Sequence, residues 1–348
     1  MPGELRDDSV FVADVKEGSR HYNKGNFGYP MHGGGLELDL IEAVFLLECD
    51  RLEVLCDGRQ MTFEELFIHA SAVHDGFDIV YIVYRDLRQR GFVVKAESGG
   101  FDLSVFPRGS TMSDSRPTYM VRAVSERTEA CMTDLSGEVA QTENAGRRLL
   151  YGVVDEEGDL TYYIMSARDP GGSVKANGVA RAVRGHLIRD RVFVFDGEGA
   201  KALREGGFYG KIDGSGLQLS LIEGCHLIST GELEVESSSG SMSESELREF
   251  GRRSQNEFDL RMKAFVDLRR RGLVVKTGFK YGTHFRVYEG SPDDCHARYL
   301  VHAIKASQVT MWPEISRTVR LSGGVKKEIL FCRVGSSVEY LEFKWFRP

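Results

Sequence analysis

The chain has 348 residues, of which 41% are hydrophobic and 28% charged, the balance of a folded globular protein with room for two or more cores. No apolar run approaches the ~20 residues of a membrane-spanning helix, so we expect no membrane partner. The net charge of −7 is unevenly spread, because residues 261–348 hold 17 Lys and Arg against 8 Asp and Glu, or +9, and the remainder holds −16. A basic segment suits a polyanionic partner, although a solvated basic surface gives the same pattern.

The elements expected along the chain come in matching pairs. Short strands are expected at 11–14 and 192–195, and helical segments at 36–47 and 217–227. The next helices start behind capping boxes, in which Thr62 or Ser243 is followed three residues later by Glu. Amphipathic helices at 77–90 and 258–271, each stopped by glycine, then lead into Val-Val-Lys strands. A last helix at 312–321 and a hairpin of strands at 328–334 and 338–346 complete the pattern.

This pairing reflects an internal duplication. Residues 36–95 match 217–276 at a constant offset of 181 without a gap, and the block DLRQRG at 86–91 returns as DLRRRG at 267–272. The period is too long for a solenoid or a propeller, so each copy is expected to form a unit of its own. The fold class is therefore α/β (α+β), a tandem duplication with two small subdomains in each copy.

Six cysteines are scattered along the chain without a CxxC pair, which predicts reduced thiols in a cytoplasmic protein and neither a disulfide scaffold nor a structural zinc site. No acidic cluster has the spacing of metal ligands, so no metal or other cofactor is expected.

The chemistry-bearing residues concentrate in the second copy. Residues 276–288 read KTGFKYGTHFRVY, and they are followed by HARYLV at 296–301 and by VRL and VKK at 319–321 and 325–327. These stretches, in this order, resemble the archaeal tRNA-intron (splicing) endonucleases built from two fused repeats, and the resemblance covers the whole chain. It implies a catalytic triad of Tyr, His and Lys that needs no metal, falling on Tyr288, His296 and Lys327.

The residue types suit that chemistry. RNA carries its own nucleophile, the 2′-hydroxyl beside the scissile phosphate, so cleavage needs a base, an acid and stabilisation of the charge on the phosphorane. Tyr288 would serve as the base, His296 as the acid and Lys327 as the electrostatic clamp, giving a 2′,3′-cyclic phosphate and a 5′-hydroxyl. An ordinary tyrosine has a pKa near ~10, so Tyr288 either gains from a neighbouring cation or only orients the hydroxyl.

The first copy is an internal control for these assignments. Aligning the two copies places Phe106 opposite Tyr288, and by the same alignment Arg116 stands opposite His296 and Arg147 opposite Lys327. Phenylalanine cannot take a proton, and arginine does not release one at neutral pH. We therefore expect the first copy to be a scaffold without acid–base chemistry.

The same reasoning divides the chain into five parts. We expect the degenerate repeat to have an N-terminal subdomain and a pseudo-catalytic subdomain, a linker rich in Pro and Gly to follow, and the active repeat to have an N-terminal subdomain and a nuclease-like catalytic subdomain. The expected ranges are 1–85, 86–167, 168–189, 190–260 and 261–348.

The resemblance also implies substrate and assembly contacts. Two arginines that clamp a bulged base by cation–π stacking fall on Arg320 and Arg347, the second by its place near the C-terminus. Family members dock as homodimers through an acidic hairpin loop that enters a basic groove of the partner. Here that loop would carry four acidic side chains, Asp155, Glu156, Glu157 and Asp159.

The sequence thus predicts an endoribonuclease that cuts precursor tRNA at bulge–helix–bulge junctions, working as a homodimer. Two alternatives stay open at this point. Both copies could be inert, leaving a non-catalytic protein that binds structured RNA, or the same chemistry could serve a less selective RNase.

Overall fold

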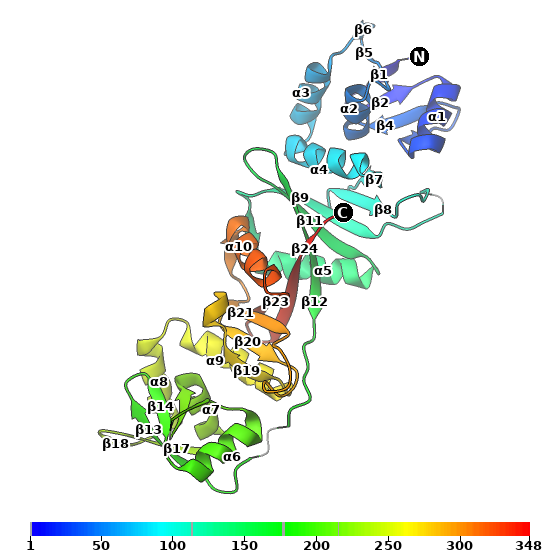
Figure 1. Cartoon of the computed structure of the whole chain (residues 1–348). Coiled ribbons are helices and arrows are strands. Elements are labelled where there is room, and N and C mark those ends of the chain that lie inside the picture. The colour runs from blue at the N-terminus through cyan, green and yellow to red at the C-terminus, as the bar shows by residue number, and fades with distance from the viewer. Residues whose placement is uncertain (1, 113, 176–177, 215) are drawn as a thin grey trace.

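The computed structural model describes residues 2–112, 114–175, 178–214 and 216–348. The molecule is elongated, with a small sheet toward each end and a large sheet in the middle to which both repeats contribute (Figure 1). The N-terminus lies at one end and the C-terminus lies in the middle, beside the large sheet. This arrangement confirms the expected α/β fold and its tandem duplication.

Each repeat begins with a small sheet and its helices. The first comprises β1 (Gly3–Leu5), β2 (Ser9–Val12), α1 (Val15–Gly25), β3 (Tyr29–Pro30), β4 (Leu36–Asp39), α2 (Leu40–Glu48), β5 (Val54–Cys56), β6 (Arg59–Gln60) and α3 (Phe63–Val73). The second comprises β13 (Val183–Ile188), β14 (Arg191–Val194), α6 (Gly197–Gly207), β15 (Lys211–Asp213), β16 (Gly216–Ser220), α7 (Leu221–Ser229), β17 (Leu233–Ser237), β18 (Gly240–Met242) and α8 (Glu244–Ser254). The strand orders correspond, β3-β4-β2-β1-β5-β6 and β15-β16-β14-β13-β17-β18.

The segments expected as helices at 36–47 and 217–227 are each a strand followed by a helix, so the first part of that prediction was wrong. In β4 buried leucines alternate with partly exposed acids, which is the two-residue period of a strand. Asp39 and Ser220 then occupy the N-cap positions of α2 and α7. The helices α1 and α6 were not expected, because few apolar residues mark them.

The second subdomain of each repeat contributes five strands to one sheet. In the first repeat it comprises α4 (Phe77–Gln89), β7 (Val93–Ala96), β8 (Leu103–Phe106), β9 (Tyr119–Ser125), β10 (Glu129–Cys131), α5 (Met132–Asn144), β11 (Arg148–Val154) and β12 (Leu160–Arg168). In the second it comprises α9 (Phe258–Arg270), β19 (Val274–Thr277), a 3-10 turn at Phe279–Tyr281, β20 (Phe285–Tyr288), β21 (Tyr299–Lys305), β22 (Val309–Met311), α10 (Trp312–Gly323), β23 (Glu328–Val334) and β24 (Val338–Phe346). The helices at 77–90, 258–271 and 312–321, and the terminal hairpin, are thereby confirmed.

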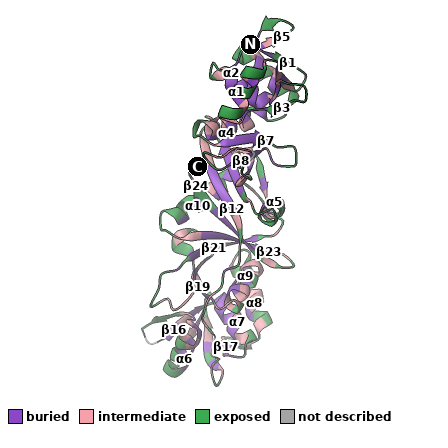
Figure 2. Ribbon diagram, turned by 90° about the vertical axis from the view of Figure 1, so that its right-hand side faces the viewer, coloured by how far each residue is buried: buried purple, intermediate pink, exposed green. Residues whose placement is uncertain are grey.

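The two repeats join through antiparallel pairing of β12 with β24, from Tyr162 opposite Phe346 to Arg168 opposite Tyr340. Over the described residues the sheet order is β19-β20-β21-β23-β24-β12-β11-β9-β8-β7. Trp312 is 2% exposed beside this seam, and the centre of its ring lies 4.8 Å from that of Tyr151 in the other repeat. The buried residues that run along the central strands in Figure 2 thus belong to a core that both repeats build.

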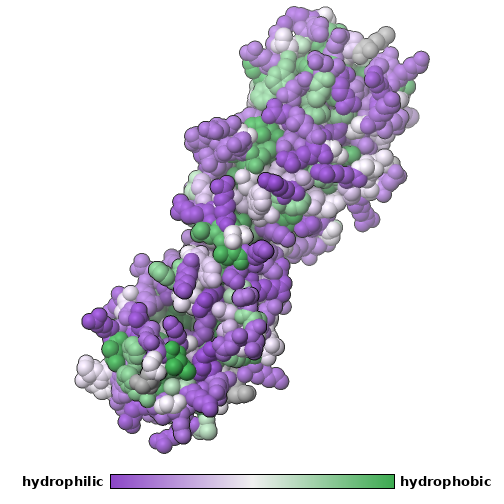
Figure 3. Space-filling model, viewed as in Figure 1, coloured by the Kyte–Doolittle hydropathy of each residue, from purple (hydrophilic) through white to green (hydrophobic). Residues whose placement is uncertain are grey.

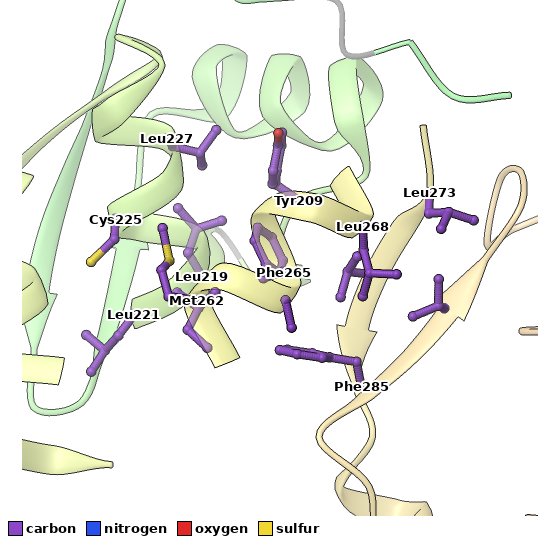
Figure 4. Close-up of a cluster of buried hydrophobic side chains, with 14 of the residues drawn as sticks. Tyr209, Leu219, Leu221, Cys225, Leu227, Met262, Phe265, Leu268, Leu273 and Phe285 are labelled. Carbon is purple, nitrogen blue, oxygen red and sulfur yellow. The ribbon is translucent and has the colours of Figure 1, made fainter. Parts of the chain in front are cut away.

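A second kind of core links the two subdomains within each repeat. One cluster of buried side chains includes Leu219 and Cys225 from the small-sheet subdomain together with Phe265 and Val287 from the large-sheet subdomain. Figure 4 shows part of this cluster, with α7 and α9 facing each other across it. The expected boundaries at 85/86 and 260/261 fall inside α4 and α9, whose buried faces belong to these shared cores.

The segment 168–189, expected as a linker, holds a strand at its end. β13 covers Val183–Ile188 and pairs in parallel with β17, so that a stretch of six residues there is part of the second small sheet. Gly185 fits this strand closely, because a Cβ at that position would lie 2.8 Å from Val192. The polar residues of β13 hide the strand pattern in the sequence.

The surface view in Figure 3 shows a face dominated by hydrophilic residues, with hydrophobic ones confined to small patches. Within the described part of the chain, no helix has both the length and the apolar character that crossing a bilayer requires.

Candidate active site

Tyr288 ends strand β20 at the outer part of the large sheet. Along this strand Phe285 and Val287 face the core that α9 covers, so the alternation of a strand turns Tyr288 to the other face. The residue is 8% exposed and packs in a small apolar cluster with Val274, its cross-strand partner, and Ala297. The phenol is therefore held at a fixed place by its neighbours.

His296 lies in the loop between β20 and β21 and is exposed. The preceding turn is closed by Ser291, whose carbonyl oxygen accepts hydrogen bonds from the backbone N–H and the thiol of Cys295, both at 3.1 Å. On the other side, the N–H of Arg298 donates to the carbonyl of Val287 at 3.1 Å. The imidazole is thus carried on a short loop that is tied at both ends.

Lys327 follows α10 and precedes β23. Its backbone N–H donates to the carbonyl of Ser322 at 3.2 Å, which closes the end of the helix. Its ammonium group donates to the carbonyl oxygen of Ala297 at 2.6 Å and lies 5.9 Å from the centre of the Tyr281 ring. The side chain therefore reaches across to the loop that carries His296.

Ala297 links the positions of these three residues. It follows His296 directly, packs against Tyr288 and accepts the hydrogen bond of Lys327. The structure thereby brings together three residues that the sequence separates by up to 39 positions. Sequence reasoning missed Ala297, because a small apolar side chain carries no chemical signal.

An ion-pair network lies under the loop and was also missed. Arg298 binds Glu289 at 2.7 Å and Glu328 at 2.9 Å, and Glu328 in turn binds Arg168 at 2.7 Å. Arg168 belongs to β12 of the first repeat and also binds Glu342 at 2.6 Å. A residue of the first repeat thus takes part in the ion pairs beside the loop that bears His296.

The two arginines expected to clamp a base lie apart from this cluster. Arg320 is exposed on α10 and lines a cavity of about 540 Å³ together with Trp312 and Tyr163. Arg347 is exposed near the C-terminus, and its guanidinium lies 5.1 Å from the ring of Trp345. Arg347 is not part of the wall of the Arg320 cavity.

The acidic loop between β11 and β12 is a tight turn. The carboxylate of Asp155 accepts hydrogen bonds from the backbone N–H groups of Glu157 at 3.0 Å and Asp159 at 2.8 Å. Glu156 forms an ion pair with Arg127. Asp155 and Asp159 line the same cavity as Arg320, so this loop already faces basic side chains of its own chain.

The strand registers support the alignment of the two copies. Val93 pairs with Phe106 where Val274 pairs with Tyr288. In the first repeat Tyr119 pairs with Arg148, and in the second repeat Tyr299 pairs with Glu328. The residues that precede Arg148 and Glu328 are therefore equivalent, namely Arg147 and Lys327. The Arg147 guanidinium contacts the sulfur of Met120 at 3.1 Å, and Arg116 is exposed.

Within residues 2–112, 114–175, 178–214 and 216–348, no three or more His, Cys, Asp or Glu side chains gather as a metal ion would require.

Comparison with known proteins matches this chain to a single family over nearly its whole length. The catalytic C-terminal domain of tRNA intron endonucleases matches residues 77–162 and 258–340, and the N-terminal domain matches 1–67 and 183–248. A tRNA-splicing endonuclease of Methanococcoides burtonii is 36% identical over 98% of both chains, and one of Methanosarcina mazei is 37% identical over 97% of both. A tRNA-splicing endonuclease of Natronomonas pharaonis is 36% identical over the full length of both chains. With both domains present twice, in the order of its two repeats, this chain belongs to the tRNA intron endonuclease family.

Proposed function

We propose that this protein cuts precursor tRNA at the bulge–helix–bulge junctions between exon and intron, without a metal ion, and leaves 2′,3′-cyclic phosphate and 5′-hydroxyl ends. The observation that carries this proposal is that Ala297 packs against Tyr288, accepts the hydrogen bond of Lys327 and follows His296 in the chain, an arrangement of these residue types found in one repeat only. In the other repeat the same frame holds side chains that cannot exchange protons at neutral pH. Family membership supports the endonuclease activity and the tRNA substrate.

Each of the three residues has a distinct part in the proposed reaction. Tyr288 takes the proton of the 2′-hydroxyl, or orients it, from a position fixed by packing. His296 protonates the 5′-oxygen as it leaves, for which an exposed loop gives it access to a bulky RNA. Lys327 stabilises the charge that develops on the phosphorane, and its bond to Ala297 aims its ammonium group beforehand.

Recognition and assembly are part of the same proposal. Arg320 and Arg347 are the candidate base-clamping residues, and both are exposed. Two chains would be needed to cut two junctions, and Asp155, Glu156, Glu157 and Asp159 would contact the partner chain. Six unpaired cysteines support a location in the cytoplasm.

The test is cleavage of an end-labelled bulge–helix–bulge RNA in excess EDTA. Cuts at both bulges, with cyclic phosphate ends, are expected from the wild type. A substrate with a 2′-deoxynucleotide at one junction should be cut only at the other, because the nucleophile is missing. Cleavage of the deoxy junction, or loss of all cleavage with EDTA, would refute the mechanism. Equal cleavage of intronless structured RNAs would instead indicate a less selective RNase, and binding without cleavage an inert scaffold.

A further inference from the structure

A cavity of about 880 Å³ lies between the small sheet of the second repeat and the outer edge of the large sheet. Tyr288 forms part of its wall. Six basic side chains line it, Arg191, Arg204, Lys211, Arg261, Lys276 and Arg286. Three acidic side chains line it too, Asp190, Glu223 and Asp293, so the wall has an excess of three positive charges.

Among the described residues, several of these basic side chains have N–H groups that make no hydrogen bond. Arg204 binds Asp293 with one amino group at 2.7 Å, and Arg261 binds Gln255 at 2.7 Å. Yet Nη1 of Arg204, Nε of Arg261 and Nε of Arg286 are enclosed and find no acceptor within the described part of the chain. Buried donors without a partner are rare in folded proteins, and all three belong to arginines that line this one cavity.

His284 adds a neutral donor to the same wall. Its Nδ1 accepts a hydrogen bond from the backbone N–H of Ala303 at 3.0 Å. Burial, aided by His302 and Arg261, lowers the pKa of His284 to about 4, so the ring is uncharged at neutral pH. Because Nδ1 is an acceptor, the proton of the neutral ring sits on Nε2, which is free to donate.

The first repeat shows which of these side chains the fold itself requires. Lys276 corresponds to Lys95, and each binds a buried glutamate and a glycine carbonyl at equivalent positions of its repeat. The other five basic residues have uncharged counterparts in the first repeat. The matching strand registers and helices align them with Ser9, Tyr22, Tyr29, Val80 and Ser104. His284 is replaced by Asp102, which accepts the equivalent bond from Ala123.

The cavity has fixed walls. Phe265 and Phe285 line it and at the same time belong to the continuous core of the second repeat, where their rings lie 6.2 Å apart. Figure 4 shows both side chains within this packed cluster, between α9 and β20. Because the two subdomains share this core, the elements that carry the basic side chains are held in place relative to Tyr288.

We propose that this cavity holds phosphate groups of the substrate RNA backbone on one side of the cleavage site. The proposal rests on the function proposed above. Guanidinium groups bind phosphate oxygens through paired N–H donors, and four of the six basic side chains in this wall are arginines. An RNA strand whose scissile phosphate lies at Tyr288 passes the cavity with its neighbouring phosphates. Tyr288 belongs to both sites, which makes them continuous.

The comparison between repeats is the strongest support for this assignment. Five basic side chains occur only in the repeat that carries the proposed acid–base residues, whereas the lysine that the fold uses occurs in both. In the first repeat, acidic Glu37 and Asp39 stand where Gln218 and Ser220 line the cavity. Those carboxylates would repel a phosphate, so the first repeat lacks the subsite as well as the triad.

The test compares Arg286→Gln with Arg253→Gln, a control on α8 that lies outside the cavity and pairs with Glu249. Cleavage of a bulge–helix–bulge RNA is followed over a range of salt concentrations. For Arg286→Gln we expect KM to rise about tenfold with little change in kcat, and the log–log salt slope of binding to fall by about 1. Arg286→Lys should recover part of the loss. The double variant of Arg191→Gln and Lys211→Gln, both at exposed positions, gives the same reading without disturbing the core.

Shortened substrates show whether the phosphates are those of the RNA. Removing the nucleotides beyond the junction on one side should raise KM for the wild type and add nothing further for Arg286→Gln. Wild-type KM and salt slope in folded variants, or truncation effects that add fully to the substitution, would overturn the proposal. Inorganic phosphate that binds the cavity without competing with RNA would identify a free-anion site and overturn it too. A wild type that binds RNA through this cavity but never cleaves would refute the proposed function alone.

Discussion

The two large-sheet subdomains share a backbone frame and differ in the side chains at one end of it. Val93 pairs with Phe106 in the first repeat, and Val274 pairs with Tyr288 in the second. Around that end the second repeat has the proposed triad and a basic cavity, and the first has neither set of side chains. The residues that hold the fold have therefore been retained separately from those proposed to act on RNA.

Both repeats also contain an equivalent lysine–glutamate ion pair, and its geometry differs between them. Lys95 lies 2.6 Å from Glu42, with 5% and 0% of the two side chains exposed. Lys276 lies 3.5 Å from Glu223, with 14% and 10% exposed. The pair is looser in the second repeat, where it lines the basic cavity. The structural element is thus common to both, but it is tighter where no ligand is proposed.

The largest expected effect follows from removing the proposed acid from one repeat and its counterpart from the other. His296→Ala should lower the cleavage rate by about 10²–10⁴, because general acid catalysis contributes roughly that much. Arg116→Ala should leave the rate within about twofold of the wild type. Single-turnover cleavage of a bulge–helix–bulge RNA measures both. An equal loss from the two substitutions would mean that the first repeat takes part in the chemistry.

The buried pairs give the next largest effect. Lys95→Met leaves Glu42 enclosed without a cation and should lower the free energy of unfolding by about 3–5 kcal/mol. Lys276→Met, in the more exposed pair, should cost roughly 1–3 kcal/mol. Urea unfolding monitored by circular dichroism measures both, and a larger loss for Lys276→Met would contradict this ranking.

The pH dependence of the same variant follows from Glu42. Burial is the main cause that raises the pKa of this carboxyl, while Lys95 lowers it, so removing Lys95 raises it further. A carboxyl whose pKa is higher in the folded than in the unfolded state gains protons on folding. The free energy of unfolding then rises as the pH falls toward the pKa that the carboxyl has in the unfolded state. The deficit of Lys95→Met relative to the wild type should therefore shrink between neutral pH and about pH 5. A deficit that grows on acidification would show that Glu42 is not the cause.

Arg168 tests whether the first repeat supports the active one. Arg168→Ala removes the ion pairs to Glu328 and Glu342 and leaves the loop of His296 less firmly held. We expect kcat to fall about tenfold, equivalent to ~1.4 kcal/mol, with little change in KM. Lys344→Ala, an exposed position on β24, is the matched control. An unchanged kcat would confine the support of the loop to the second repeat.

The smallest expected effect concerns assembly. Asp155→Asn with Glu157→Gln keeps the turn, because Asn retains the oxygen that accepts the backbone N–H groups, but removes two charges. Exposed charge pairs are worth about 0.2–1 kcal/mol each, so each charge removed should raise the dimer dissociation constant by roughly 1.4- to 5-fold at low salt and less at high salt. Sedimentation equilibrium measures it, with Asp7→Asn and Asp8→Asn as an exposed control pair. A wild type that is monomeric at all concentrations would contradict the homodimer.

Much of this architecture could be predicted from the sequence, because duplication and helix caps are local signals. Local sequence patterns predicted the helix that begins at Phe77, its counterpart at Phe258 and the capping boxes. The pairing of β12 with β24 was not, because nothing in either strand specifies a partner about 180 residues away. The candidate site was predicted from the resemblance of its sequence stretches to a known family, whereas the contacts of Ala297 and Arg168 follow only from the folded structure.

The most direct test of the central claim, one active and one scaffold repeat per chain, is to count cuts made by a heterodimer. One chain carries His296→Ala and the other is wild type, and a single turnover is followed with excess enzyme and a competitor RNA that traps dissociated protein. One cut per RNA, at either junction, and no released intron are expected. Intron release at the wild-type yield would contradict the claim, because the first repeat would then hold a second competent site.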